Sequence, residues 1–202
     1  MALIEDTWRR IEDWLTEHAP ESLAQLGSPV TADDLALAGR VVGDLPPEYV
    51  ALLRIHDGVD SAQYGTGIFG GFVLRSLAGA LADRDSWRQA YDDLRRDYDI
   101  DASMQAPAGV RQAWWHAGWL PVAVNADDPR TTVFLDLDPA PGGTRGQLVR
   151  HVVENDALVL ICGGVGAWLE QIAATLEGGG VTVARDGDTV VGLDWPVEQG
   201  GP

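Results

Sequence analysis

The segment from Leu45 to Gly58 constrains the fold more than any other, because it marks both ends of a buried helix. Pro46 and Pro47 suit a first helical turn, where a missing N–H group costs no hydrogen bond. Gly58 suits the left-handed position just past a helix end. Between these ends, an apolar face repeats at three- and four-residue spacing and consists of Tyr49, Leu52, Leu53 and His56. The segment therefore predicts a helix over 46–57 with one face in the core.

Similar patterns predict the other elements. Helices are expected over 5–18, 31–41, 76–97 and 165–177, and strands over 68–74, 119–124, 132–137, 147–153 and 157–161. Short connections between the strands favour antiparallel pairing. The chain is expected to be an α+β fold, with a mostly antiparallel sheet of about five to six strands flanked by helices. We expect one domain over 1–202, with residues 179–202 forming a C-terminal hairpin and tail.

A second group of motifs lies in the later half of the chain. Gly118-Trp119-Leu120-Pro121 is followed by Leu135-Asp136-Leu137-Asp138-Pro139 and then by Gly142-Gly143-Thr144-Arg145-Gly146-Gln147. With 45–58, a Trp8 motif near the start and a Trp168 motif near the end, these motifs follow a fixed order between about residues 5 and 178. In this order the chain resembles the SUKH superfamily, which includes bacterial immunity proteins and fungal regulators of cell-wall synthesis of the Smi/Knr type.

The resemblance implies a core over about 5–178, with helices on one face of the sheet. It says nothing about residues 60–117, which are longer than the family minimum, or about 179–202. It also implies that the matching positions are mainly structural, and these are Trp8, Leu45, Pro46, Tyr49, Gly58, Trp119, Pro121, Asp136, Pro139, Gly143, Gly146, Gln147 and Trp168.

The charge of the chain restricts its partners. The formal net charge is −17, every basic residue is arginine, and the acidic residues concentrate in 1–60 and 154–202. Such a field repels nucleic acid and anionic membranes and attracts basic proteins, although it is also a simple aid to solubility. With no apolar run of about 18 residues, we expect a soluble, cytoplasmic protein. The single Cys162 excludes a disulfide within the chain.

Catalytic and metal motifs are weak in this sequence. No nucleophile elbow occurs, and the four histidines stand apart from one another. Four aspartates near turns are the best alternative, as an acid/base pair or a cation site: Asp127, Asp128, Asp136 and Asp138. Their spacing does not match a calcium loop, and an aspartate before proline usually begins a turn. We expect no cofactor, no metal and no enzymatic activity.

The leading hypothesis is a non-enzymatic immunity protein that neutralises a cognate toxin, possibly a basic nuclease, by direct binding. The first alternative is a regulatory or scaffold protein that binds a housekeeping partner, and the second is an enzyme that uses the aspartates. The expected binding surface joins the end of the 46–57 helix to the turn before the predicted 132–137 strand. Its residues are Asp57, Asp60, Tyr64, Asp127, Asp128 and Arg130. Neither the partner's identity nor the oligomeric state follows from the sequence.

Overall fold

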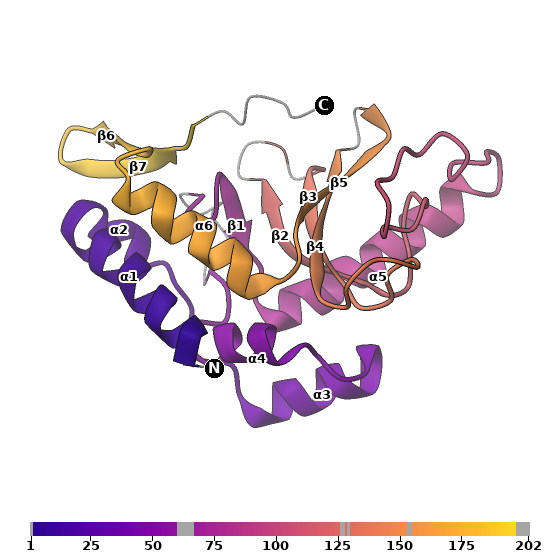
Figure 1. Cartoon of the computed structure of the whole chain (residues 1–202), viewed down its shortest axis with the longest axis horizontal. Coiled ribbons are helices and arrows are strands. Elements are labelled where there is room, and N and C mark those ends of the chain that lie inside the picture. The colour runs from indigo at the N-terminus through magenta and orange to yellow at the C-terminus, as the bar shows by residue number, and fades with distance from the viewer. Residues whose placement is uncertain (1, 60–66, 126–127, 129, 153–154, 197–202) are drawn as a thin grey trace.

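The protein is an α+β fold built around a five-stranded antiparallel sheet, as predicted. The structure is a computed structural model that describes residues 2–59, 67–125, 128, 130–152 and 155–196. In these residues the sheet strands follow chain order from edge to edge (Figure 1) and are β1 (Phe72–Leu74), β2 (Trp119–Asn125), β3 (Thr132–Asp136), β4 (Gln147–Val152) and β5 (Ala157–Cys162). The helices are α1 (Ala2–His18), α2 (Pro20–Leu23), α3 (Ala32–Val42), α4 (Pro47–Leu53), α5 (Leu77–Leu94) and α6 (Val165–Glu177).

One face of the sheet forms the main core with α1, α4 and α6. These helices lie together beside the sheet in Figure 1, and α1 packs along α6. Trp8 of α1 stacks on Phe69 with ring centroids 5.6 Å apart, and Phe69 contacts Trp168 of α6 at 5.4 Å. Because large aromatic side chains bury most apolar area per residue, this row of rings anchors both helices to the centre of the molecule.

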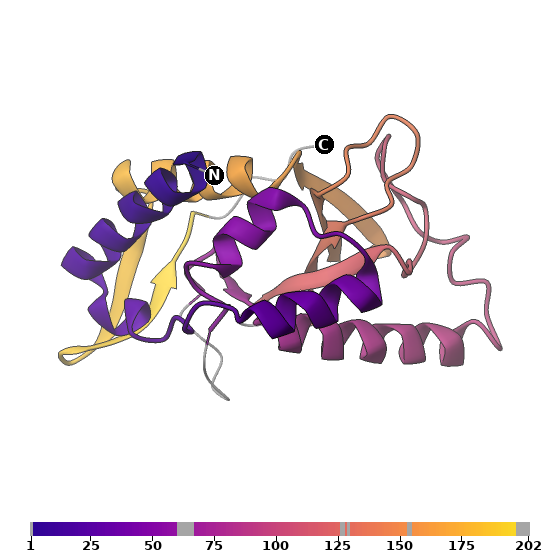
Figure 2. The same cartoon turned by 90° about the horizontal axis from the view of Figure 1, so that it is seen from below.

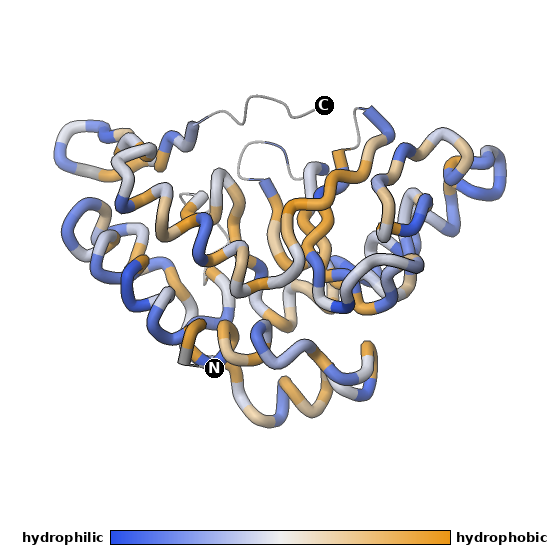
Figure 3. The backbone as a smooth tube through the Cα atoms, in the orientation of Figure 1, coloured by the Kyte–Doolittle hydropathy of each residue, from blue (hydrophilic) through white to orange (hydrophobic). Residues whose placement is uncertain are grey.

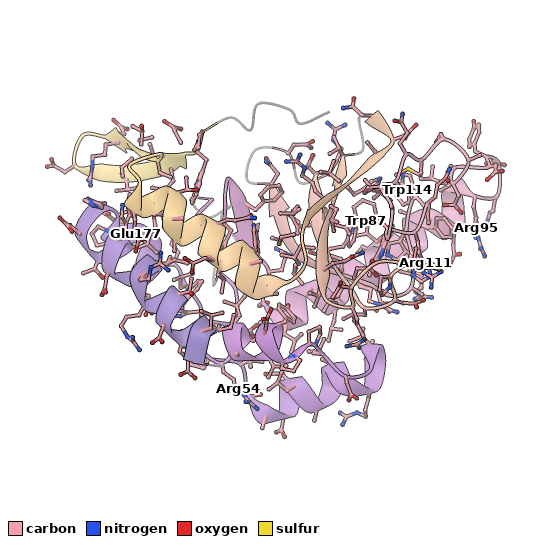
Figure 4. The ribbon with its side chains drawn as sticks, in the orientation of Figure 1. Arg54, Trp87, Arg95, Arg111, Trp114 and Glu177 are labelled. Atoms are coloured by element: carbon pink, nitrogen blue, oxygen red, sulfur yellow. The ribbon has the colours of Figure 1, made fainter. Side chains whose placement is uncertain are left out.

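The opposite face of the sheet is also covered, which differs from the one-sided arrangement implied by the resemblance. Helix α5 packs against β2, and Figure 2 shows α5 and α6 on opposite sides of the sheet. A second core lies there, formed by buried Met104, Val110, Trp115, Trp119, Phe134, Val149 and Leu158. Trp87 and Trp114 close this core from α5 and from the segment that follows it (Figure 4). The long 60–117 region, for which the family pattern offered no guidance, thus supplies an extra layer.

Two predicted elements are shorter than expected. Helix α4 ends at Leu53 rather than near residue 57, and His56 lies beyond it, with Nε2 2.9 Å from a Glu12 carboxylate oxygen and Nδ1 2.9 Å from the Gly27 carbonyl oxygen. Strand β1 begins at Phe72 because Gly70 and Gly71 both adopt positive φ angles, 69° and 82°, which break the extended chain. The predicted 68–74 strand is therefore shortened to its last three residues.

The predicted C-terminal hairpin is present and packs on the main core. It consists of β6 (Thr182–Asp186) and β7 (Thr189–Asp194), which pair antiparallel. Val190 and Leu193 are buried in the main core, and β7 contacts α2. Within the described residues, no helix is both long and apolar enough to cross a bilayer. Figure 3 shows the hydrophobic residues concentrated in the sheet, with hydrophilic residues along the outer helices.

The second core contains a histidine that should make the protein sensitive to acid. His151 is fully buried against Trp87, Trp114 and Phe134, and neither ring nitrogen has a hydrogen-bond partner. Burial lowers the pKa of His151 from 6.5 to about 4, because the apolar surroundings oppose its positive charge.

We expect His151→Phe to flatten the loss of stability between neutral and acidic pH. In the unfolded chain the histidine takes up a proton near pH 6.5, so the folded state is fully favoured above that pH and loses about 3 kcal/mol as the pH falls to about 4. Urea unfolding of both proteins at several pH values measures this difference. Parallel pH profiles of the free energy of unfolding for the wild type and the variant would contradict the lowered pKa of His151.

Candidate functional site

A buried carboxylate joins the later sequence motifs. Asp136 is fully buried at the end of β3, and its Oδ2 accepts a hydrogen bond from Gln147 Nε2 at 2.9 Å. Its Oδ1 accepts from the Asp138 backbone N–H at 3.1 Å. The same Gln147 nitrogen donates to the Gly109 carbonyl, and its Oε1 accepts from the Thr144 N–H. Burial raises the pKa of Asp136, while the Gln147 hydrogen bond opposes that rise. This network, here called the Asp136 network, closes the β3–β4 connection.

Glycines allow the backbone segments around the Asp136 network to approach closely. A Cβ atom at Gly143 would lie 2.1 Å from the Gly109 carbonyl oxygen and 2.8 Å from the Pro139 side chain. Gly146 has φ of 93°, and a Cβ there would lie 3.1 Å from Pro46. The glycine turn therefore contacts both the 99–117 region and the start of α4, so side chains at these positions would force the segments apart.

The 45–58 segment connects three other elements. Pro46 lies against Gly146, and the Glu48 carboxylate accepts a hydrogen bond from the Gly166 N–H at 3.0 Å, in the first turn of α6. A carboxylate at a helix N-terminus satisfies a free N–H group and interacts favourably with the helix dipole. Helix α4 thus fixes where α6 begins.

The end of the same segment fixes the start of α5. Asp57 is half-buried, and its Oδ1 accepts from the Leu77 N–H at 2.6 Å. Burial raises the Asp57 pKa, an effect that the Leu77 hydrogen bond opposes. Gly58 has φ of 73°, and a Cβ there would lie 2.2 Å from the Ser76 nitrogen. The predicted left-handed glycine is therefore present, and it also admits the backbone of the α5 N-terminus.

The remaining motif positions lie in the cores or beside irregular points of the backbone. Trp8, Tyr49 and Trp119 are fully buried, and Trp168 is 5% exposed. Leu45 packs on the main core. Pro121 lies where the β2–β3 register shifts, a position that tolerates a residue without an N–H group. These positions therefore belong to the packing of the two cores and the sheet.

The residues expected to bind a partner are only partly placed. Asp60, Tyr64 and Asp127 lie outside the described residues. Asp57 bonds to Leu77, shortly after the last residue of β1. Asp128 comes three residues after Asn125, and Asn125 pairs with Phe72, the first residue of β1. Asp128 accepts from the Arg130 guanidinium at 2.9 Å, and that hydrogen bond is the main cause of its lowered pKa. Among the described members, Asp128 and Arg130 bond to each other, and Asp57 is engaged with the Leu77 N–H.

The aspartates do not form a reactive group in the described residues. Both carboxylate oxygens of Asp136 accept hydrogen bonds, and exposed Asp138 forms an ion pair with Arg111 at 2.9 Å. Within the described part of the chain, no three histidine, cysteine, aspartate or glutamate residues are grouped to hold a metal ion.

Two structural residues were missed by sequence reasoning. The Gly109 carbonyl accepts from Gln147, and Gly109 contacts Gly143, but it lies in the 60–117 region, about which the resemblance says nothing. Glu48 begins α6 through a contact 118 residues away in sequence, so no local pattern marks it.

Gln147→Met should destabilise the protein strongly. The change leaves Asp136 Oδ2 and the Gly109 carbonyl without their donor, so we expect a loss of about 2–4 kcal/mol at pH 7. Removal of the Gln147 donor should raise the pKa of Asp136 further, so the loss should shrink as the pH falls toward the ordinary carboxyl pKa of about 4. Urea unfolding at both pH values measures it, with Gln112→Met at an exposed position as the control. Equal stabilities of the two variants would contradict this role.

Glu48→Ala should cost about 0.5–2 kcal/mol, because the Gly166 N–H loses its acceptor. Glu48→Gln keeps an acceptor oxygen and should recover part of this loss. Glu17→Ala, at an exposed position of α1, is the matched control and should change stability by less than about 0.5 kcal/mol. Thermal unfolding of the three variants provides the comparison, and a Glu48→Gln loss as large as that of Glu48→Ala would argue against the cap.

Comparison with known proteins identifies fungal relatives. The chain is 29% identical over 93% of its length to the "Cell wall biosynthesis/cell cycle regulator smi1" of Schizosaccharomyces pombe, covering 39% of that protein. It is 25% identical over 90% of its length to the "Cell wall assembly regulator SMI1" of Saccharomyces cerevisiae, covering 42% of it. A third relative, the "Glucan synthesis regulatory protein" of Neurospora crassa, is 23% identical over 91% of the chain and is covered over 40% of its length. The chain spans less than half the length of these relatives.

These relatives correct the leading functional hypothesis. The expectation of a bacterial immunity protein in a toxin–antitoxin pair is wrong, because the matched proteins are named as fungal regulators of cell-wall synthesis. The superfamily resemblance itself is confirmed. A profile described as the SMI1 / KNR4 family (SUKH-1) matches residues 29–171, which include α4, the whole sheet and the Asp136 network. With that match over most of its length, the chain belongs to the SMI1/KNR4 family (SUKH-1).

Proposed function

We propose that the protein is a regulator that acts by binding a protein partner, in a process related to cell-wall assembly. The names of its relatives support the process, since those proteins are regulators of cell-wall or glucan synthesis. In this role the protein binds a partner and catalyses no reaction, as in the regulatory alternative drawn from the sequence.

The engagement of the motif residues within the chain carries the proposal. Asp136, Gln147 and Glu48 direct their polar groups to neighbouring backbone or side chains. A catalytic site would need such groups pointed at a substrate. Here they position the sheet and helices instead, which suits a rigid scaffold that presents a surface.

The charge of the chain suggests the chemistry of the partner. With a net charge of −17, the protein attracts basic segments and speeds their association. Exposed acidic residues on α1 contribute to this field, and they are Glu5, Asp6, Asp13 and Glu17. We propose a partner with basic segments, a single domain over residues 1–202 and a cytoplasmic location. The burial of hairpin residues Val190 and Leu193 in the main core supports the single domain.

Deletion of the gene in its own host tests the regulatory role. Cells without the protein should become sensitive to an agent that perturbs the cell wall, and the wild-type gene should restore their growth. A second gene carrying Gln147→Met should restore growth poorly, because the variant is less folded. Growth of the deletion strain that is indistinguishable from the parent, over a full range of agent concentrations, would contradict the proposal.

A further inference from the structure

Helix α3 carries more apolar surface than the fold covers. Seven of its eleven residues are alanine, leucine or valine, yet of these seven the structure buries Ala38 alone. Figure 1 shows α3 at the margin of the molecule, beyond α4, and Figure 3 shows hydrophobic residues along it. A helix with apolar residues on most of its sides is normally covered by other elements. Part of α3 is therefore available to another molecule.

Two separate stripes of apolar side chains run along α3. Leu35, Ala38 and Val42 pack on the main core. Leu37 and Val41 are four residues apart, so they lie on one side of the helix in successive turns. At about 100° per residue, that side is about 110° around the helix axis from the core-facing stripe. Leu37 is 47% exposed and Val41 is 48% exposed. This second pair is here called the Leu37 stripe.

Both ends of α3 are tied to the rest of the fold. Just before the helix, the Val30 N–H donates to the carbonyl of Leu53, the last residue of α4, at 2.9 Å. Just after the helix, the Arg145 guanidinium donates to the Asp44 carbonyl. A helix that is already held in place loses little conformational freedom when a partner binds. The Leu37 stripe is thus presented in a fixed position.

Two charged side chains without partners border the Leu37 stripe. Asp33 is four residues before Leu37 and Arg40 is three residues after it, so both neighbour Leu37 on the helix surface. Both are exposed, and within the described residues neither has a hydrogen bond or an ion pair. Asp34 differs, because it bonds with the capping Thr31. The stripe therefore has a free acid toward one end and a free base toward the other.

These features define the chemistry of a partner. An eleven-residue helix is about 16 Å long, which a second helix of about three turns matches. Apolar residues at three- and four-residue spacing on that helix pack against the Leu37 stripe. Charge complementarity then calls for a basic residue near Asp33 and an acidic residue near Arg40. A second copy of this chain is a poor match, because two chains with a net charge of −17 repel each other.

We propose that the Leu37 stripe of α3 binds an amphipathic helix of a partner protein, with a basic residue beside Asp33 and an acidic residue beside Arg40. The apolar contacts supply most of the affinity, and the two charges set the direction in which the partner helix lies. This inference rests on the proposed function, since it names the surface by which the regulator holds its partner.

Selection from a random library of 16-residue peptides tests the stripe on the full-length protein. Enriched peptides should carry apolar residues at three- and four-residue spacing, with a basic and an acidic residue toward opposite ends. A synthetic peptide of the enriched sequence should bind Leu37→Gln about tenfold more weakly than the wild type, because glutamine removes apolar contact area. Leu94→Gln, the same change at a 40% exposed position of α5, is the matched control and should bind normally.

Charge reversal tests the direction of the partner helix. Asp33→Lys should weaken binding of the enriched peptide by about twofold to fivefold, because the basic residue of the peptide then meets a like charge. A second peptide, with glutamate in place of that basic residue, should bind Asp33→Lys more tightly than it binds the wild type. If the second peptide prefers the wild type, the assigned charge contact is wrong.

Amide chemical shifts give a measurement that does not depend on a variant. Addition of the enriched peptide should shift the amides of α3 most, and the peptide should gain helical circular dichroism when it binds. The proposal is overturned if no peptide is enriched, if Leu37→Gln and Leu94→Gln bind equally, or if the largest shifts lie outside α3. A wild-type dimer that is lost in Leu37→Gln would also overturn it, by making a second copy the occupant.

The result is separable from that of the deletion experiment. Deletion tests whether the protein regulates the cell wall and makes no use of α3. Library selection tests α3 with purified protein and makes no use of the phenotype. A deletion phenotype with no peptide binding would therefore reject the α3 site alone.

Discussion

The hydrogen bonds of the buried Asp136 carboxylate are the constraint on which much of the fold depends. An ionised carboxylate in the interior is costly unless donors surround it, and Gln147 and the Asp138 N–H supply them. Gln147 also bonds to Gly109, which holds the 99–117 region against the β3–β4 connection. The second core can form only when that region is in place, because Trp114 and Trp115 come from it. One polar network thus positions an entire hydrophobic layer.

The 45–58 segment has a corresponding role in positioning the helices. It touches the glycine turn through Pro46, starts α6 through Glu48 and starts α5 through Asp57. Each contact is short-range and directional, so this one segment positions both α5 and α6, which lie on opposite faces of the sheet. This arrangement leaves the outer surfaces free to differ in chemistry without disturbing the core.

Much of the fold could be predicted from local patterns. Apolar spacing located α1, α3, α5 and α6 within a few residues, and alternating residues located β2 to β5. Local patterns failed where long-range contacts decide. Helix α4 stops at Leu53 because the next residues turn to bond with Gly27 and Leu77, and β1 is short because two glycines leave the extended conformation. The expected partner-binding residues stay a prediction, and the structure adds only that Asp57 bonds to the Leu77 N–H while Asp128 bonds to Arg130.

By itself, the sequence determined the type and order of the elements, the α+β class, the acidic charge and the superfamily, because these follow from residue spacing, composition and motif order. Only the tertiary structure decided that the sheet is covered on both faces and that Glu48 begins α6. Those properties arise from residues far apart in the chain. Their contact energies depend on distances and burial that no local window contains.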